Sequence, residues 1–107
     1  MLRIYNVILD WLTELVPLID RIAHHDPDLA KQLRRASRSV ALNTAEGMLA
    51  RGRTRTACYN TALRETREAF CALEISVRLG YLRQMDHGFE QRCRQIIGTL
   101  HRLSYPK

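Results

Sequence analysis

The chain has 107 residues, of which 46% are hydrophobic and 26% are charged, and it carries a net charge of +6. This length suits one small domain with a single core, and the composition excludes a disordered chain. No run of about 18 apolar residues is present, which excludes a membrane-spanning helix. Cys58, Cys71 and Cys93 are odd in number and include no CxxC pair, so we expect reduced thiols in a cytoplasmic protein.

Apolar residues recur at steps of three and four over residues 3–24, which predicts a first helix. The seam expected to face the core consists of Ile4, Ile8, Trp11, Leu15, Leu18 and Ile22. Additional apolar residues make this helix more hydrophobic than one core requires, so we expect part of it to contact another subunit. The predicted oligomer interface consists of Val7, Trp11, Leu12, Val16 and Ile19.

A second helix is predicted over residues 27–50, with Asp26 as its N-cap and Pro27 at its first position. Its expected inward face is lined by small residues and includes Asn43. A buried amide needs hydrogen-bond partners, and Glu46 lies three residues further along the same helix face. We therefore predict a structural polar network of Asn43, Glu46 and Arg35; a ligand-binding cluster is the alternative interpretation.

Two further helices are predicted over residues 55–79 and 86–103. Gly52 is expected to end the second helix, Thr54 or Thr56 to cap the third, and Asp86 to cap the fourth. Four helices joined by short connections pack alternately up and down. The predicted fold is therefore all-α: one antiparallel up-down-up-down four-helix bundle that spans residues 1–107.

A specific motif lies on the second helix. It reads Gln32-Leu33-Arg34-Arg35-Ala36, then Ser39-Val40, Asn43 and Ala45-Glu46-Gly47. This pattern resembles the signature of the four-helix-bundle proteins encoded in intervening sequences of bacterial 23S ribosomal RNA genes, also called the S23 ribosomal protein family. Residues 69–74 and the turn Leu79-Gly80-Tyr81-Leu82 are similar to later blocks of that family. The resemblance covers the chain from the second helix onward.

The resemblance implies a four-helix bundle that assembles as a ring, with homopentamers as the recurring form, and it implies no enzymatic activity. It also implies similarity to the accessory proteins of diversity-generating retroelements, which are basic pentameric barrels that bind nucleic acid and a reverse transcriptase. We accordingly expect the partners to be further copies of the chain and RNA or DNA, with no membrane and no small-molecule substrate.

The positive charge comes from 15 Arg against 2 Lys, and a guanidinium pairs with phosphate through two hydrogen bonds at once. The candidate nucleic-acid-binding residues are Arg34, Arg35 and Arg38 on the second helix and Arg51, Arg53 and Arg55 at the following turn. In a symmetric ring these would form a repeated basic surface that binds phosphates in a salt-dependent manner. The alternative is a solvated face whose arginines pair with Asp28, Glu65 and Glu68.

Two other functions are weighed against nucleic-acid binding. A structural or adaptor oligomer would use the apolar face of the first helix and bind another protein. A ribonuclease is suggested by Arg94 and His101, whose spacing resembles the R-x4-6-H motif of the HEPN ribonucleases, although a single short motif has a high false-positive rate. The tight turn His24-His25-Asp26 is expected to cap a helix and not to hold a metal. We predict no catalytic residue, metal or cofactor.

Overall fold

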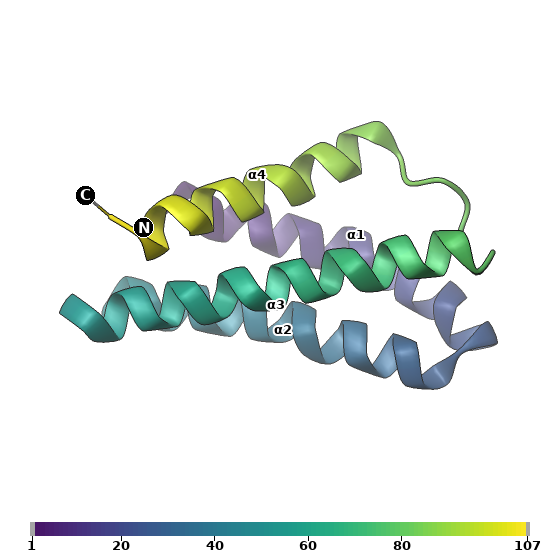
Figure 1. Cartoon of the computed structure of the whole chain (residues 1–107), viewed down its shortest axis with the longest axis horizontal. Coiled ribbons are helices and arrows are strands. Elements are labelled where there is room, and N and C mark those ends of the chain that lie inside the picture. Colours follow the sequence, from purple (N-terminus) through teal and green to yellow (C-terminus); the bar gives the residue numbers. More distant parts are fainter. Residues whose placement is uncertain (1, 107) are drawn as a thin grey trace.

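The computed structural model describes residues 2–106; Met1 and Lys107, the two ends of the expected domain, lie outside the described residues. The described part folds into four helices and contains no strand: α1 (Arg3–His25), α2 (Pro27–Leu49), α3 (Gly52–Arg78) and α4 (His87–Ser104). Consecutive helices run in opposite directions along the long axis (Figure 1). The predicted all-α four-helix bundle is therefore confirmed.

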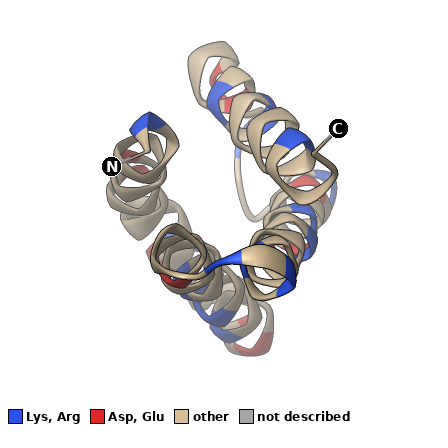
Figure 2. Ribbon diagram, turned by 90° about the vertical axis from the view of Figure 1, so that its left-hand side faces the viewer, with Lys and Arg blue, Asp and Glu red and all other residues tan. Residues whose placement is uncertain are grey.

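The helices surround a common centre when the bundle is viewed along its axis (Figure 2). Each packs against the helices before and after it in the chain, and α4 closes the arrangement against α1. Two polar contacts join α1 to α4. Trp11 Nε1 donates to Cys93 Sγ at 3.3 Å, and Arg92 donates to both carboxylate oxygens of Glu14. None of the helices in residues 2–106 is long and apolar enough to cross a membrane.

Two predicted helix caps are present. Asp26 Oδ1 accepts a hydrogen bond from the Leu29 amide at 3.0 Å, with Pro27 at the first helical position of α2. Asp86 Oδ2 accepts from the Phe89 amide at 3.2 Å at the start of α4. These carboxylates satisfy amide groups that have no partner within the helix, and so they fix where α2 and α4 begin.

The turn between α2 and α3 is tighter than predicted. Gly52 has φ +57, a left-handed conformation that glycine adopts at little cost, and α3 begins there, about three residues earlier than expected. The predicted threonine caps are wrong, since Arg51 occupies the N-cap position and no side chain caps the helix. Because the turn is so short, Thr54 and Thr56 already lie inside α3. The short turn also keeps Arg51, Arg53 and Arg55 close together at one end of the bundle.

The core confirms most of the predicted seams. The largest fully buried side chains come from all four helices and include Trp11, Leu15, Leu33, Leu63, Leu73, Ile96 and Leu100. Buried hydroxyls are satisfied locally: Thr44 Oγ1 donates to the Val40 carbonyl at 2.8 Å, and Thr66 Oγ1 donates to Ala62 at 2.7 Å. The small-residue face of α2 brings α3 close, because a Cβ added to Gly47 would lie 2.5 Å from the Tyr59 ring.

Candidate nucleic-acid interface

The predicted arginines of α2 lie along the outer face of that helix. They border one surface groove, which we call the α2 groove; it is lined by Lys31, Arg34, Arg35, Arg38, Ser39, Leu42, Asn43 and Glu46. Arg34 and Arg38 also border a second depression between α1 and α2, beside Leu12, Val16 and Ile19. The polar motif residues Arg34, Arg35, Ser39, Asn43 and Glu46 thus line one groove, whereas Leu33, Ala36 and Val40 of the same motif are buried in the core. Arg34 and Arg38 border both hollows.

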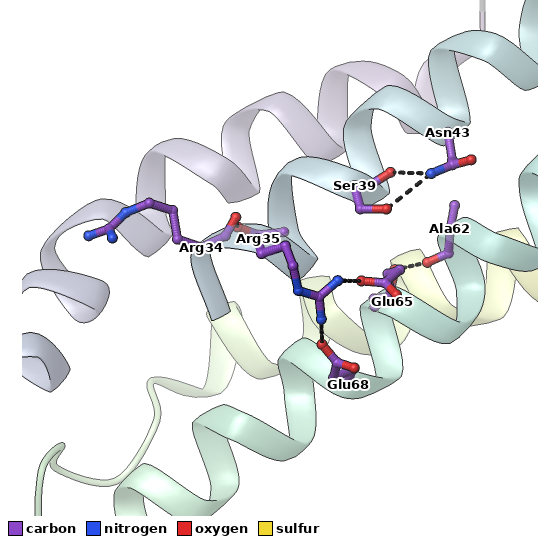
Figure 3. A network of polar contacts seen from close by, with 9 residues as sticks. Arg34, Arg35, Ser39, Asn43, Ala62, Glu65 and Glu68 are labelled. Atoms are coloured by element: carbon purple, nitrogen blue, oxygen red, sulfur yellow. Dashed lines mark hydrogen bonds and ion pairs between the residues drawn. The ribbon is translucent and has the colours of Figure 1, made fainter. Parts of the chain in front are cut away.

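Arg35 differs from its neighbours because it is engaged with α3. Its Nη1 lies 3.1 Å from Glu65 Oε2, and its Nη2 pairs with Glu68 (Figure 3). Arg34 points away from this pair (Figure 3). Arg35 therefore fits the alternative of local pairing, and it neutralises carboxylates that would otherwise repel phosphate. Such an exposed pair contributes little to stability.

Arg51, Arg53 and Arg55 are exposed at the α2–α3 turn, where Lys and Arg segments face the viewer in Figure 2. Arg55 Nε donates to the Ala50 carbonyl at 2.9 Å, which satisfies a carbonyl at the end of α2. Within residues 2–106, arginine ion pairs involve Arg35, Arg92 and Arg94. The candidate arginines that remain without a carboxylate partner in this part of the chain are Arg34, Arg38, Arg51, Arg53 and Arg55.

The predicted polar network does not form in the protomer. Asn43 Nδ2 donates to the Ser39 carbonyl and to Ser39 Oγ, both at 3.0 Å (Figure 3). No hydrogen bond in residues 2–106 joins Asn43 to Glu46 or to Arg35, and Glu46 is exposed. The physical reason is helix phase: Thr44 occupies the buried position of this turn, while Asn43 lies half-buried at the edge of the α2 groove.

The predicted oligomer interface needs correction. Trp11 is 0% exposed and Ile19 6% exposed, so both belong to the protomer's own core and are not available to another subunit. Val7 and Leu12 are half-buried, and Val16 is 57% exposed. Trp11 belongs to the core seam and not to the interface, because it is fully buried and its Nε1 donates to Cys93 Sγ.

Further exposed apolar residues, outside the predicted interface, lie on α1 and α2. Leu42 is 63% exposed and Leu49 is 88% exposed, and Leu9 on α1 is also exposed. The pairs Leu9 and Val16, and Leu42 and Leu49, are each seven residues apart, so each pair shares one helix face. That spacing was visible in the sequence as an apolar repeat outside the core seam. We call these four residues the α1–α2 apolar face.

The histidines and the ribonuclease-like pair are separate from these surfaces. His24 Nδ1 hydrogen-bonds the Asp20 carbonyl at 2.8 Å, as expected for a group near the end of a helix. Arg94 pairs with Glu90 at 3.0 Å and lies over the Phe70 ring, whereas the His101 ring lies 5.0 Å from that of Tyr105. At about 1.5 Å per residue, Arg94 and His101 lie roughly 10 Å apart along α4, so they do not converge within one protomer.

Residues 2–102 match the family of 23S rRNA-intervening sequence proteins. The chain belongs to this family. The match includes α1, so it extends beyond the part of the chain where the motif resemblance was recognised. Among solved structures, the chain is similar to a protein of unknown function from the S23 ribosomal protein family of Bacteroides thetaiotaomicron, with a TM-score of 0.83 at 22% identity. That likeness covers 94% of this chain and 97% of the other and shows the shared fold. A comparison with curated proteins finds no match.

Titratable groups in this 23S rRNA-intervening sequence protein do not assemble into a metal site: residues 2–106 contain no cluster of three His, Cys, Asp or Glu side chains with the required geometry. Burial raises the pKa of the Cys93 thiol to about 11, so this core cysteine stays protonated near neutral pH, and the thiolate is the reactive form. The hydrogen bond to Glu14 raises the pKa of Arg92. The candidate interface thus consists of positively charged arginines beside exposed apolar residues, an arrangement that suits binding of an anion.

Proposed function

We propose that the protein is a non-enzymatic, cytoplasmic homo-oligomer that binds the phosphate backbone of nucleic acid. The observation that carries this proposal is that four candidate arginines form no ion pair in the described residues. Arg34, Arg38, Arg51 and Arg53 border the α2 groove or the α2–α3 turn without an ion pair in residues 2–106, while Arg35 occupies Glu65 and Glu68. These four guanidinium groups are thus available to bind a phosphate.

The chemistry favours backbone contacts over base recognition. A guanidinium binds phosphate oxygens through two parallel hydrogen bonds, and such contacts position a duplex without reading its sequence. Each neutralised phosphate releases condensed counterions, so affinity falls as salt rises. We expect weak sequence preference and strong salt dependence for a duplex ligand.

Oligomerisation would both cover the α1–α2 apolar face and multiply the arginines. Val16 and Leu42 are exposed apolar residues that line the hollows bordered by Arg34 and Arg38. Burying such a face against another copy would be favourable, and each added copy would bring a further set of arginines to the same assembly. The family resemblance implies five copies, which is the number we propose.

The same apolar residues favour a second candidate, an adaptor that binds another protein. Leu42 lies within the α2 groove, between Arg38 and Glu46, which could pair with charged groups of a partner. An apolar residue surrounded by charged side chains is typical of a protein interface. The adaptor would make its contacts through Leu42 and Leu49, and nucleic acid would not bind.

Binding to a short DNA duplex and a short RNA duplex, followed by fluorescence anisotropy at low salt, separates these functions. The test variant combines Arg51→Gln with Arg53→Gln. The control combines Arg78→Gln with Arg83→Gln, which removes the same charge from exposed sites at the other end of α3 and in the loop after it. The proposal predicts a larger loss of affinity in the test variant than in the control. An absence of duplex binding at low salt, together with Leu42-dependent capture of a protein, would favour the adaptor instead.

A further inference from the structure

The seam between α3 and the end of α4 carries an exposed aromatic residue that no predicted site includes. Tyr105, the residue that follows α4, is 59% exposed. Asn60 Nδ2 donates to the Tyr105 hydroxyl at 3.0 Å. The His101 ring lies 5.0 Å from the Tyr105 ring, tilted by 52°. The phenol is thus anchored at its polar edge while much of the ring remains accessible to solvent.

Arginines continue along α3 on both sides of this contact. Arg53, Asn60, Arg64 and Arg67 follow one another at i, i+7, i+11 and i+14, a spacing that places them on one helix face. The three arginines are exposed, and none forms an ion pair within residues 2–106. The hydrogen bond between Asn60 and Tyr105 sets the aromatic residue beside this line of charge.

Glu65 and Glu68, the acidic residues of α3 nearest to Arg64 and Arg67, do not cancel this charge, and Glu74, the third acidic residue of the helix, lies beyond Arg67. Glu65 and Glu68 extend toward α2, where both pair with Arg35 (Figure 3). The end of α4 lies near the same end of the bundle as the α2–α3 turn (Figure 1). Arg53, Arg64 and Arg67 therefore share one face of α3 with Asn60, the residue that contacts Tyr105.

We propose that this α3–α4 seam, formed by Arg53, Asn60, Arg64, Arg67, His101 and Tyr105, binds single-stranded nucleic acid. The inference rests on the proposed nucleic-acid binding and names the form of the ligand at this surface. Arginines that track a backbone, combined with an exposed ring on which a base stacks, are the two components of single-strand binding. A duplex satisfies its base faces internally, so Tyr105 has nothing to stack against in a duplex.

Three matched probes test this inference on the full-length protein: a uridine-rich RNA strand, a thymidine-rich DNA strand and a short DNA duplex, each measured at low salt. Tyr105→Leu keeps an apolar side chain without a ring, whereas Tyr105→Phe keeps the ring and loses the hydroxyl that Asn60 contacts. Stacking predicts that Tyr105→Leu weakens single-strand binding roughly 5- to 150-fold and leaves duplex binding unchanged. Tyr105→Phe is expected to retain most single-strand affinity.

The two single strands identify the source of the contacts. Equal affinity assigns them to bases and phosphates, which both strands share, and tighter binding of RNA adds a contact to the 2′-hydroxyl. His101→Leu provides a second variant, and it is expected to reduce single-strand affinity less than Tyr105→Leu does. Unfolding curves for all variants establish that each remains folded.

The inference and the proposed function fail in different ways. Salt-dependent duplex binding that persists while Tyr105→Leu leaves single-strand affinity unchanged would overturn the single-strand inference alone. An equal loss for duplex and single strand in Tyr105→Leu would also overturn it, because stacking would not be the cause. If none of the three probes binds, both the inference and the proposed function are overturned.

Discussion

Trp11 Nε1 donates a hydrogen bond to Cys93 Sγ at 3.3 Å in the fully buried centre of the bundle. This contact joins α1 to α4, and Trp11 is the largest side chain of the core. It also explains why Trp11 cannot serve the oligomer interface, since the indole would have to leave both its cavity and its acceptor. The pair gives the first prediction.

Replacing Trp11 with alanine is expected to lower the free energy of unfolding by about 3–5 kcal/mol, because a large buried side chain is removed and a cavity remains. Trp11→Phe, which keeps an aromatic ring, is expected to lower it by less. Urea unfolding of the wild type and both variants measures these differences. A Trp11→Ala protein of unchanged stability but altered oligomer mass would contradict this and would support the prediction that Trp11 lies in the oligomer interface.

Cys93 is expected to resist thiol reagents at pH 8 in the folded protein, whereas the exposed Cys71 reacts. The reason is that the thiolate is the reactive form, and burial raises the pKa of Cys93 to about 11. A variant that combines Cys58→Ser with Cys71→Ser keeps Cys93 as its single thiol, which should react slowly in the folded protein and become accessible in denaturant. Rapid modification of Cys93 in the folded variant would contradict its assigned burial.

The same pKa predicts how stability depends on pH. The folded pKa of Cys93, about 11, lies above its ordinary value of 9.0, so the folded state holds the proton more tightly than the unfolded state. The stabilisation that Cys93 contributes to the free energy of unfolding is complete below pH 9. It falls by roughly 2–3 kcal/mol as the pH rises toward 11. Unfolding measured across this range should show a smaller decline in Cys93→Ala. Identical declines in the two proteins would contradict the prediction.

Two glycine substitutions should have opposite effects. Gly47→Ala places a Cβ 2.5 Å from the buried Tyr59 ring, so we expect a loss of about 1–3 kcal/mol from overpacking between α2 and α3. Gly98→Ala, in α4, meets only the flexible Arg102 side chain at 3.6 Å and should gain up to about 1 kcal/mol from helix propensity. Thermal unfolding of the pair checks both signs. Equal effects would mean that Gly47 is not a close-approach position.

The proposed oligomer depends on the α1–α2 apolar face. Val16→Asp or Leu42→Asp is expected to reduce the particle mass measured by light scattering, because an exposed charge would be buried on association. Ile75→Asp is the matched control, since Ile75 is 47% exposed on α3, away from this face. A mass that is unchanged in the first two variants, or reduced equally in all three, would contradict the assignment.

The fold could be predicted from the sequence because its signals are local and repeated. The seams of α1 and α4 recur every three or four residues, and Asp26 and Asp86 precede their helices in the positions that capping requires. The start of α3 differs from the prediction because Gly52 allows a tighter turn than threonine capping at Thr54 or Thr56 requires. Capping preference concerns the residues at one helix end and does not predict how few residues can connect two helices.

The candidate surface was harder to predict because side-chain partners come from other helices. The sequence located the arginine clusters, but only the packing of α2 on α3 shows that Arg35 meets Glu65 and Glu68. The prediction places Asn43 on the inward face, whereas Thr44 is the buried residue. A small shift in helix phase decides which of the two positions faces the core. Tyr105 reaches Asn60 across 45 residues of sequence, and no local pattern records that contact.

The central claim is that unpaired arginines bind nucleic-acid phosphates, and the salt dependence of duplex affinity tests it most directly. Between about 50 and 200 mM salt, log affinity should fall linearly with log salt, with a slope near −0.9 for each phosphate neutralised. Removing Arg51 and Arg53 should make that slope shallower by about 1 for each arginine that contacts a phosphate, whereas removing Arg78 and Arg83 should leave it unchanged. A duplex affinity that does not respond to salt, or that responds identically in both variants, would contradict the claim.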